Sequence, residues 1–158
     1  LTDLHRAVNV RLLDRLAAAG DQTMQEMRAQ GITDTRQRLL ALARAYLNFV
    51  EKHPVGWSAL LAFNREQATV DEPEDYRKRF DALFEIIAVV LADGAVAMDE
   101  KRRRLVARVL WSSVHGIVTS GYTGGHTARG DHVWQQIDLL VTTFLEGLRV
   151  SSLNDRRH

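Results

Sequence analysis

Cysteine is absent from this 158-residue sequence, which excludes disulfide bonds and thiolate metal sites. Its absence fits a reducing compartment, so we expect a cytoplasmic protein. Proline is scarce, with 2 residues, and glycine contributes 10, a composition that suits a helical chain. Long apolar runs are missing as well, because the best one, residues 86–92, is too short to span a membrane. The N-terminal residues show no signal-peptide pattern, and we expect no membrane partner.

The chain also lacks a charge bias. Its 21 basic and 20 acidic residues leave a formal net charge of +1, whereas a self-sufficient DNA-binding domain usually has a stronger basic excess. The basic run at residues 101–104 is read as a solvated helix face in preference to a phosphate site. We therefore expect no specific DNA binding by this chain alone. Its length suits one domain, residues 1–150, followed by a polar tail, residues 151–158.

Hydrophobic periodicity predicts an all-α fold of about six helices. The expected helices cover residues 1–19 with an extension towards 30, then 39–50, 55–65, 74–93, 100–120 and 131–150. Gly20 is a weak point of the first helix, and residues 64–71 are the stretch expected to be most mobile. Local signals set the helix ends: Asp34, Asp99 and Asp131 as N-caps, and Gly31, Pro54 and Gly94 as stops.

The helix predicted at residues 100–120 has two apolar faces, and a surface helix needs one. The first face includes Leu110 and Trp111. The second has small residues at helix-seam spacing, so it indicates a partner chain. The last helix has an apolar arc of about 140°, wider than one neighbour requires. We therefore predict a homodimer closed by these two helices, with an interface of Val109, Ser113, Gly116, Ile117, Ser120, Val133, Ile137, Val141, Phe144 and Leu148.

Catalytic signatures are missing from the sequence, which has no Gly-rich phosphate loop, nucleophile elbow or cysteine nucleophile. His126 and His132 flank a glycine-rich loop and could fold together around a metal, but no obvious third ligand accompanies them. We predict no enzyme, no metal and no cofactor. The alternative is a free-standing helical enzyme or small-molecule carrier, metal-assisted through His115, His126 or His132.

Large apolar side chains on different helices face inward, which suits a binding module for a small apolar or aromatic ligand. The same side chains could instead simply fill the core. His115 is the best polar candidate, either in contact with the ligand or in a structural hydrogen bond. The predicted ligand-binding residues are Tyr46, Phe49, Trp57, Leu61, Phe84, Trp111 and His115.

Two motifs carry a resemblance to a known family. Trp111, His115 and Gly116 resemble the Trp-His-Gly signature in the regulatory domain of one branch of the tetracycline-repressor (TetR) family. Upstream, Tyr46, Phe49, His53-Pro54 and Trp57 are similar to that branch's aromatic helix ending in His-Pro. The resemblance covers nearly the whole chain.

The resemblance implies a ligand-sensing and dimerisation domain of a transcriptional regulator. The last two helices of each subunit would form a four-helix bundle across a two-fold axis, and the preceding helices would enclose the pocket. Ligand binding would move the first helix and thereby the DNA-binding heads. The family's helix-turn-helix domain is absent here, and Leu1 lies about where the linking helix after it would begin, so the chain, which lacks an initiator Met, resembles a fragment.

Overall fold

The computed structural model describes residues 2–67, 74–94, 96–123 and 130–155. These residues form helices and no strand, which confirms the all-α prediction. Across the described ranges, no helix combines the length and hydropathy that a membrane crossing needs. The helices are α1 (Thr2–Ala29), α2 (Thr35–Lys52), α3 (Pro54–Gln67), α4 (Glu74–Ala92), α5 (Glu100–Thr123) and α6 (Gly130–Asp155).

Gly31 turns the chain between α1 and α2. Its φ of 69° lies in the left-handed region that glycine adopts without a Cβ penalty. The Gly31 N–H donates to the Arg28 carbonyl, and the Ile32 N–H donates to the Met27 carbonyl at 2.9 Å, the pattern of a Schellman cap. Asp34 then caps α2, because its carboxylate accepts the Gln37 N–H at 2.9 Å. Both predicted signals are confirmed.

Pro54 separates α2 from α3. The His53 N–H closes α2 by donating to the Phe49 and Val50 carbonyls. Pro54 opens α3, where a missing N–H costs nothing, and the Trp57 N–H donates to the His53 carbonyl at 2.9 Å. The break therefore fixes Trp57 in the first turn of a new helix directly after α2.

Other helix ends differ from the predicted ones. Asp99 caps α5 as predicted, since its carboxylate accepts the Arg102 N–H at 2.7 Å. Asp131 lies inside α6 instead of capping it, because the helix begins at Gly130. Helix α1 passes through Gly20 without a break, and α6 runs through residues 151–155 of the expected polar tail. The stretch expected to be mobile begins inside α3, and residues 68–73 lie outside the described residues.

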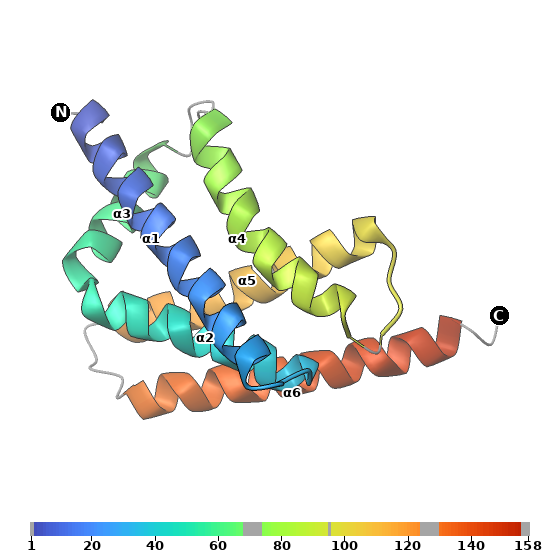
Figure 1. Ribbon diagram of the computed structural model, residues 1–158. Coiled ribbons are helices and arrows are strands. Elements are labelled where there is room, and N and C mark those ends of the chain that lie inside the picture. The colour runs from blue at the N-terminus through green and yellow to red at the C-terminus, as the bar shows by residue number, and fades with distance from the viewer. Residues whose placement is uncertain (1, 68–73, 95, 124–129, 156–158) are drawn as a thin grey trace.

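The helices are arranged around α2 (Figure 1). Helix α1 packs against α2, α3 and α4, while α5 packs against α4 and α6. Helix α6 runs along one edge of the molecule and also packs against α2. The N-terminal end of α1 lies far from the C-terminal end of α6.

The core lies where all six of these helices meet. Each helix contributes a fully buried aliphatic side chain: Leu13, Leu47, Leu60, Val90, Val118 and Ile137. Burying one such side chain contributes about 1.5–3 kcal/mol to folding. Val133 and Val141 of α6 join them, with 0% and 2% exposure. Val133, Ile137 and Val141, which the sequence pattern places in the dimer interface, therefore pack inside the subunit.

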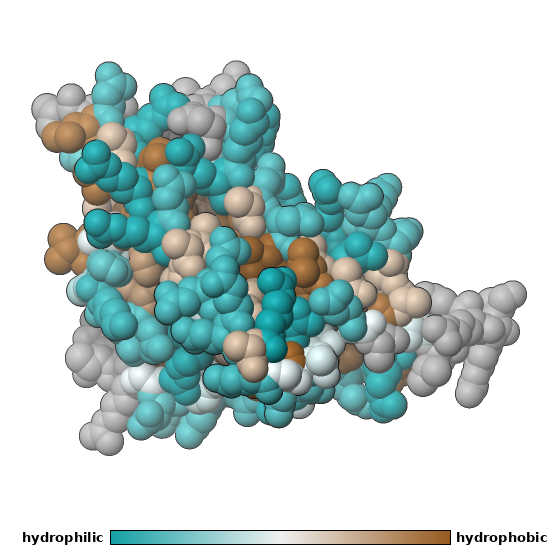
Figure 2. All heavy atoms as spheres, viewed as in Figure 1, coloured by the Kyte–Doolittle hydropathy of each residue, from teal (hydrophilic) through white to brown (hydrophobic). Residues whose placement is uncertain are grey.

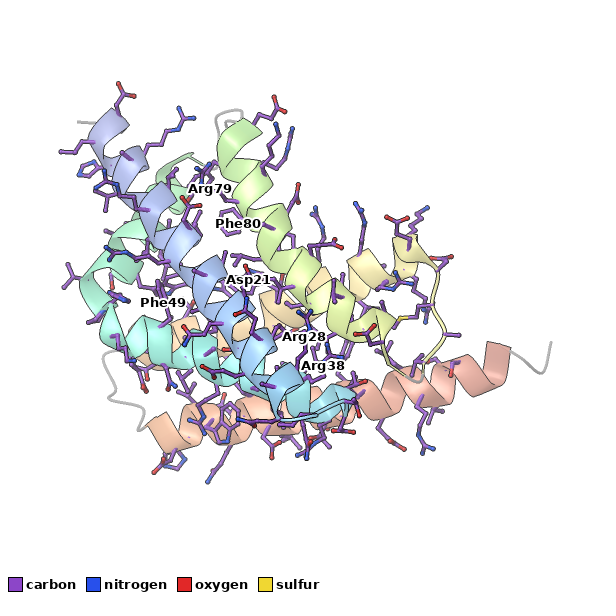
Figure 3. The ribbon with its side chains drawn as sticks, viewed as in Figure 1. Asp21, Arg28, Arg38, Phe49, Arg79 and Phe80 are labelled. Carbon is purple, nitrogen blue, oxygen red and sulfur yellow. The ribbon has the colours of Figure 1, made fainter. Side chains whose placement is uncertain are left out.

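Polar contacts fix the helices around this core. Arg36 of α2 donates to Asp138 at 2.6 Å and to Thr142 at 2.8 Å, both on α6. Asp14 of α1 pairs with Arg79 of α4 at 2.9 Å, and Figure 3 shows Arg79 between these two helices. These contacts hold α6 against α2 and α1 against α4.

Candidate functional site

Four aromatic rings from three helices meet in the middle of the molecule. Tyr46 of α2 lies 5.4 Å from Trp57 of α3 and 5.0 Å from Trp111 of α5, measured between ring centroids. His115 stacks on Trp111 at 5.9 Å with 12° between the ring planes, and its ring meets Trp57 edge-on at 5.7 Å. These four residues form the aromatic cluster.

The sequence explains how the cluster assembles. Trp111 and His115 are four residues apart on α5, so they lie one above the other on the same face. Trp57 occupies the first turn of α3 because Pro54 ends α2 and starts α3 there. Phe84 of α4 extends the cluster, with its ring 6.4 Å from Trp111 and edge-on to it.

A hydrogen bond inside the cluster joins Tyr46 Oη and His115 Nδ1 at 2.8 Å. Burial raises the pKa of Tyr46, so the phenol stays protonated. Burial lowers the pKa of His115 below its usual 6.5, so the imidazole stays neutral at physiological pH. The bond therefore joins two neutral groups in an apolar environment.

A pocket opens beside the cluster. Its cavity volume is about 70 Å³, and the whole space between its lining atoms, including solvent at its opening, is about 660 Å³. Figure 2 shows hydrophobic surface between α1 and α4, the helices that contribute Gly20 and Ile86 to the pocket wall. The lining residues come from five helices: Leu16, Gly20, Leu39, Leu42, Ala43, Ala45, Tyr46, Leu83, Ile86, Ile87, Leu110, Trp111, Val114 and Val141.

The predicted ligand-binding residues take three positions relative to this pocket. Tyr46 and Trp111 line it. Trp57, His115 and Phe84 lie behind or beside these two in the ring contacts given above. The remaining two are elsewhere: Phe49 packs on His53 at 4.7 Å, and Leu61 packs against the core.

The aliphatic half of the pocket was missed in the sequence. Gly20 was read only as a weak point of its helix, whereas in the structure it gives the pocket a wall without a side chain. Ile86 falls off the main apolar face of α4. The second half of α4 is apolar nearly all round, and that signal could have placed Ile86 on a second contact surface.

Apolar and small residues lie on the outer side of α5 and α6. Val109 is 41% exposed, and Gly116 and Ser120 are exposed, while Ser113 is half-buried and donates its hydroxyl to the Val109 carbonyl. Ile117, Phe144 and Leu148 are half-buried against the core. Exposed large apolar residues that the sequence reading did not include are Leu105, Leu139 and Val150.

Metal-ligating residues do not gather in the described part of the chain, where no group of three His, Asp or Glu side chains could hold an ion. His115 is occupied with Tyr46 in the aromatic cluster, and His132 is exposed on α6. His126 lies outside the described residues.

Comparison with known protein families gives one match. The family described as "Tetracyclin repressor-like, C-terminal domain" matches residues 39–144, which include most of α2, all of α3, α4 and α5, and the first half of α6. The aromatic cluster lies wholly within the matched residues. A search among curated proteins found no match.

Proposed function

Because this chain belongs to the family of tetracyclin repressor-like C-terminal domains, we propose that it is the ligand-sensing and dimerisation domain of a transcriptional regulator. Domains of this family are regulatory, so we expect the chain to bind a small molecule and not to catalyse a reaction. We expect it to act in the cytoplasm, on transcription. Specific DNA contacts would belong to a helix-turn-helix domain upstream of this chain.

The pocket is the observation that carries the proposal. Its wall combines two aromatic residues, Tyr46 and Trp111, with aliphatic residues from five helices. Ligand sites are mostly apolar clefts with a few polar groups, and this wall matches that description. A molecule bound here would contact α1, α2, α4, α5 and α6 at once.

Helix α1 offers a route from the pocket to the DNA-binding domain. Leu16 and Gly20 of α1 line the pocket, and the Asp14–Arg79 pair ties the same helix to α4. A ligand that binds two arrangements of α1 unequally shifts the balance between them. A coupling of about 1–3 kcal/mol would change DNA affinity roughly 5- to 150-fold.

The outer sides of α5 and α6 support dimerisation. Leu105, Val109, Leu139 and Val150 are between 41% and 69% exposed, although large apolar side chains favour burial. Gly116 and Gly147 lie in the same two helices with open space beside them, so a second copy could approach closely. A two-fold axis here would bring α5 and α6 against their own copies.

A thermal-shift screen of uncharged apolar and aromatic compounds tests the proposal. A hit present at 100 times its Kd should raise the Tm by about 5–10 °C. Calorimetry on Trp111→Ala should then show binding weakened by at least about tenfold, since the ring forms part of the pocket wall.

Trp134→Ala is the matched control. Trp134 lies on α6 and lines no part of the pocket; the Arg44 guanidinium carbon lies over its ring, 3.6 Å from the ring centroid. Its variant should bind hits as the parent does. Hits that bind Trp111→Ala as tightly as the parent would show that the ligand site is elsewhere.

A further inference from the structure

Trp57 has a buried hydrogen-bond donor without a partner. Its side chain is 3% exposed, and the indole Nε1–H has no acceptor within hydrogen-bond distance. Buried tryptophan N–H groups usually find a partner, since leaving one unmet costs free energy. An acceptor supplied from outside the chain would remove that cost.

The neighbouring side chains do not supply this acceptor. Tyr46 and His115 flank Trp57 and bond to each other at 2.8 Å, but neither places an acceptor within hydrogen-bond distance of the indole Nε1. Trp57 and Trp111 each bring an N–H and no acceptor, so the aromatic cluster holds more donors than acceptors. The missing group is therefore an acceptor.

The pocket wall argues against a charged ligand. All of the lining residues lie in the described part of the chain, and none carries a charge. A carboxylate would find no cation there, and a cation would find no anion, so either ion would lose its hydration without replacement. Burial also lowers the pKa of the neighbouring His115, which shows that this region of the core disfavours a cation.

We propose that the pocket takes an uncharged, mainly apolar molecule with one hydrogen-bond acceptor, such as a ketone or ester oxygen, which binds the Trp57 Nε1–H. The apolar body lies against Leu42, Ile86 and Gly20. Trp57 itself is not part of the pocket wall, so the acceptor has to reach it past Tyr46, which lines the pocket and packs edge-on against Trp57. This inference rests on the proposed function, because it names the chemistry of the molecule sensed in that pocket.

Four compounds with one phenylalkyl body test it. Butylbenzene and 4-phenylbutan-2-one differ by a single carbonyl, while 3-phenylpropanoate and 3-phenylpropan-1-amine carry opposite charges. The ketone should bind the parent more tightly than the two ions do. Its affinity relative to butylbenzene should fall about 2- to 10-fold in Trp57→Phe, which keeps an aromatic ring and loses the donor. Trp134→Phe makes the same change outside the pocket and should leave that ratio unaltered.

A second measurement needs no change at Trp57. The chain has three tryptophans, so Trp111→Phe and Trp134→Phe assign the indole N–H resonances and leave Trp57 by elimination. The ketone should shift the Trp57 indole proton downfield in the parent, and butylbenzene should not.

Three results would overturn the inference. The first is a Trp57 indole signal that shifts equally with the ketone and with butylbenzene. The second is a ketone-to-butylbenzene affinity ratio that is unchanged in Trp57→Phe. The third is an ion that binds the parent as tightly as the ketone does. If butylbenzene still binds and Trp111→Ala weakens it, the pocket stands and only this inference fails. If none of the four compounds binds the parent, the inference fails together with the proposed ligand site.

Discussion

At the scale of single residues, the Tyr46–His115 bond is the polar centre of an otherwise apolar site. Its 2.8 Å length and the opposite pKa shifts of the two groups have one cause, the burial of both rings among Trp57 and Trp111. Burial keeps the phenol protonated and the imidazole neutral. In the proposed site the pair would therefore present no charge to a ligand, and a proton on His115 would change that.

His115→Gln should reduce the dependence of stability on acid pH. Burial lowers the pKa of His115 below 6.5, so under acid conditions the unfolded chain takes up this proton more readily than the folded one. The free energy of unfolding should therefore fall as pH drops below about 6.5, until the lower folded pKa is passed. A glutamine side chain cannot titrate, so urea unfolding from pH 7.5 to 5 should show a shallower loss in the variant. The other histidines are common to both proteins, and equal pH slopes would refute a buried, neutral His115.

At the scale of elements, α1 contributes Leu16 and Gly20 to the pocket wall, so in the proposed function a bound molecule would contact it directly. Gly20 lies on the pocket wall, where an added Cβ would lie 3.1 Å from Ile86 Cδ1 of α4. Glycine is a poor residue for a helix interior, yet α1 continues through it as one helix of 28 residues. The missing side chain keeps space open between α1 and α4.

Gly20→Ala should stabilise the fold and weaken ligand binding. Alanine gains up to about 1 kcal/mol over glycine in a helix, and the contact it meets is the mobile end of Ile86, which can move aside. The displaced Ile86 side chain narrows the pocket, so an apolar hit should bind several-fold more weakly, as calorimetry would show. Gly56→Ala gives the matched control: its Cβ would make an ordinary contact with Leu12 at 3.6 Å, and Gly56 lines no part of the pocket, so ligand affinity should not change. Unchanged ligand affinity in Gly20→Ala would separate Gly20 from the site.

Local signals in the sequence predicted most helix boundaries, because each depends on a few neighbouring atoms. The carboxylates of Asp34 and Asp99 accept backbone N–H groups three residues further along the chain. Pro54 disfavours helical geometry at the residue before it, His53. The sequence did not predict which side of α6 faces which neighbour. Those neighbours are distant in sequence: Val133, Ile137 and Val141 are buried in the core of the subunit, and Asp138 forms an ion pair with Arg36 of α2. Amphipathicity shows which side chains avoid water, but it does not show which neighbour covers them.

The aromatic cluster was partly predictable from the sequence, because its residues can be recognised from local patterns. Tyr46, Trp57, Trp111 and His115 stand out as large or polar groups on inward faces, and the structure brings all four together. The aliphatic half depends on the crossing of α1 over α4. Leu16 and Ile86 look like any core residues until that crossing leaves a space between them.

At the scale of the whole molecule, the balanced net charge disfavours DNA binding by this chain alone. The 21 basic and 20 acidic residues nearly cancel, and several arginines are paired with carboxylates, including Arg36 with Asp138 and Arg79 with Asp14. Phosphate binding needs basic side chains free to replace counterions. The long helices also turn broad apolar faces to the core, so none of the described helices is left free to enter a DNA groove as a recognition helix.

The chain alone should therefore show no sequence-selective DNA binding. A mobility-shift titration at physiological salt, with a pool of random duplexes and competitor DNA, should give at most weak retardation that disappears as salt rises. Selection of one duplex sequence from that pool by these 158 residues would contradict the assignment of DNA recognition to another domain.

The dimer gives the sharpest test at this scale, because its disruption can be separated from damage to the subunit. Gly116 and Ser112 are both exposed on α5, and nothing lies within 4 Å of a Cβ placed on Gly116. Leucine at either position should leave the subunit folded, as circular dichroism would show. Gly116 belongs to the small-residue face expected at the two-fold axis, where each leucine would meet the partner's copy of the helix. Gly116→Leu should therefore raise the dimer dissociation constant at least about tenfold in sedimentation velocity, and Ser112→Leu should change it less.

Equal effects of the two substitutions would mean that a different face of α5 meets the partner. A parent protein that sediments only as a monomer at micromolar concentration would contradict the proposed dimer.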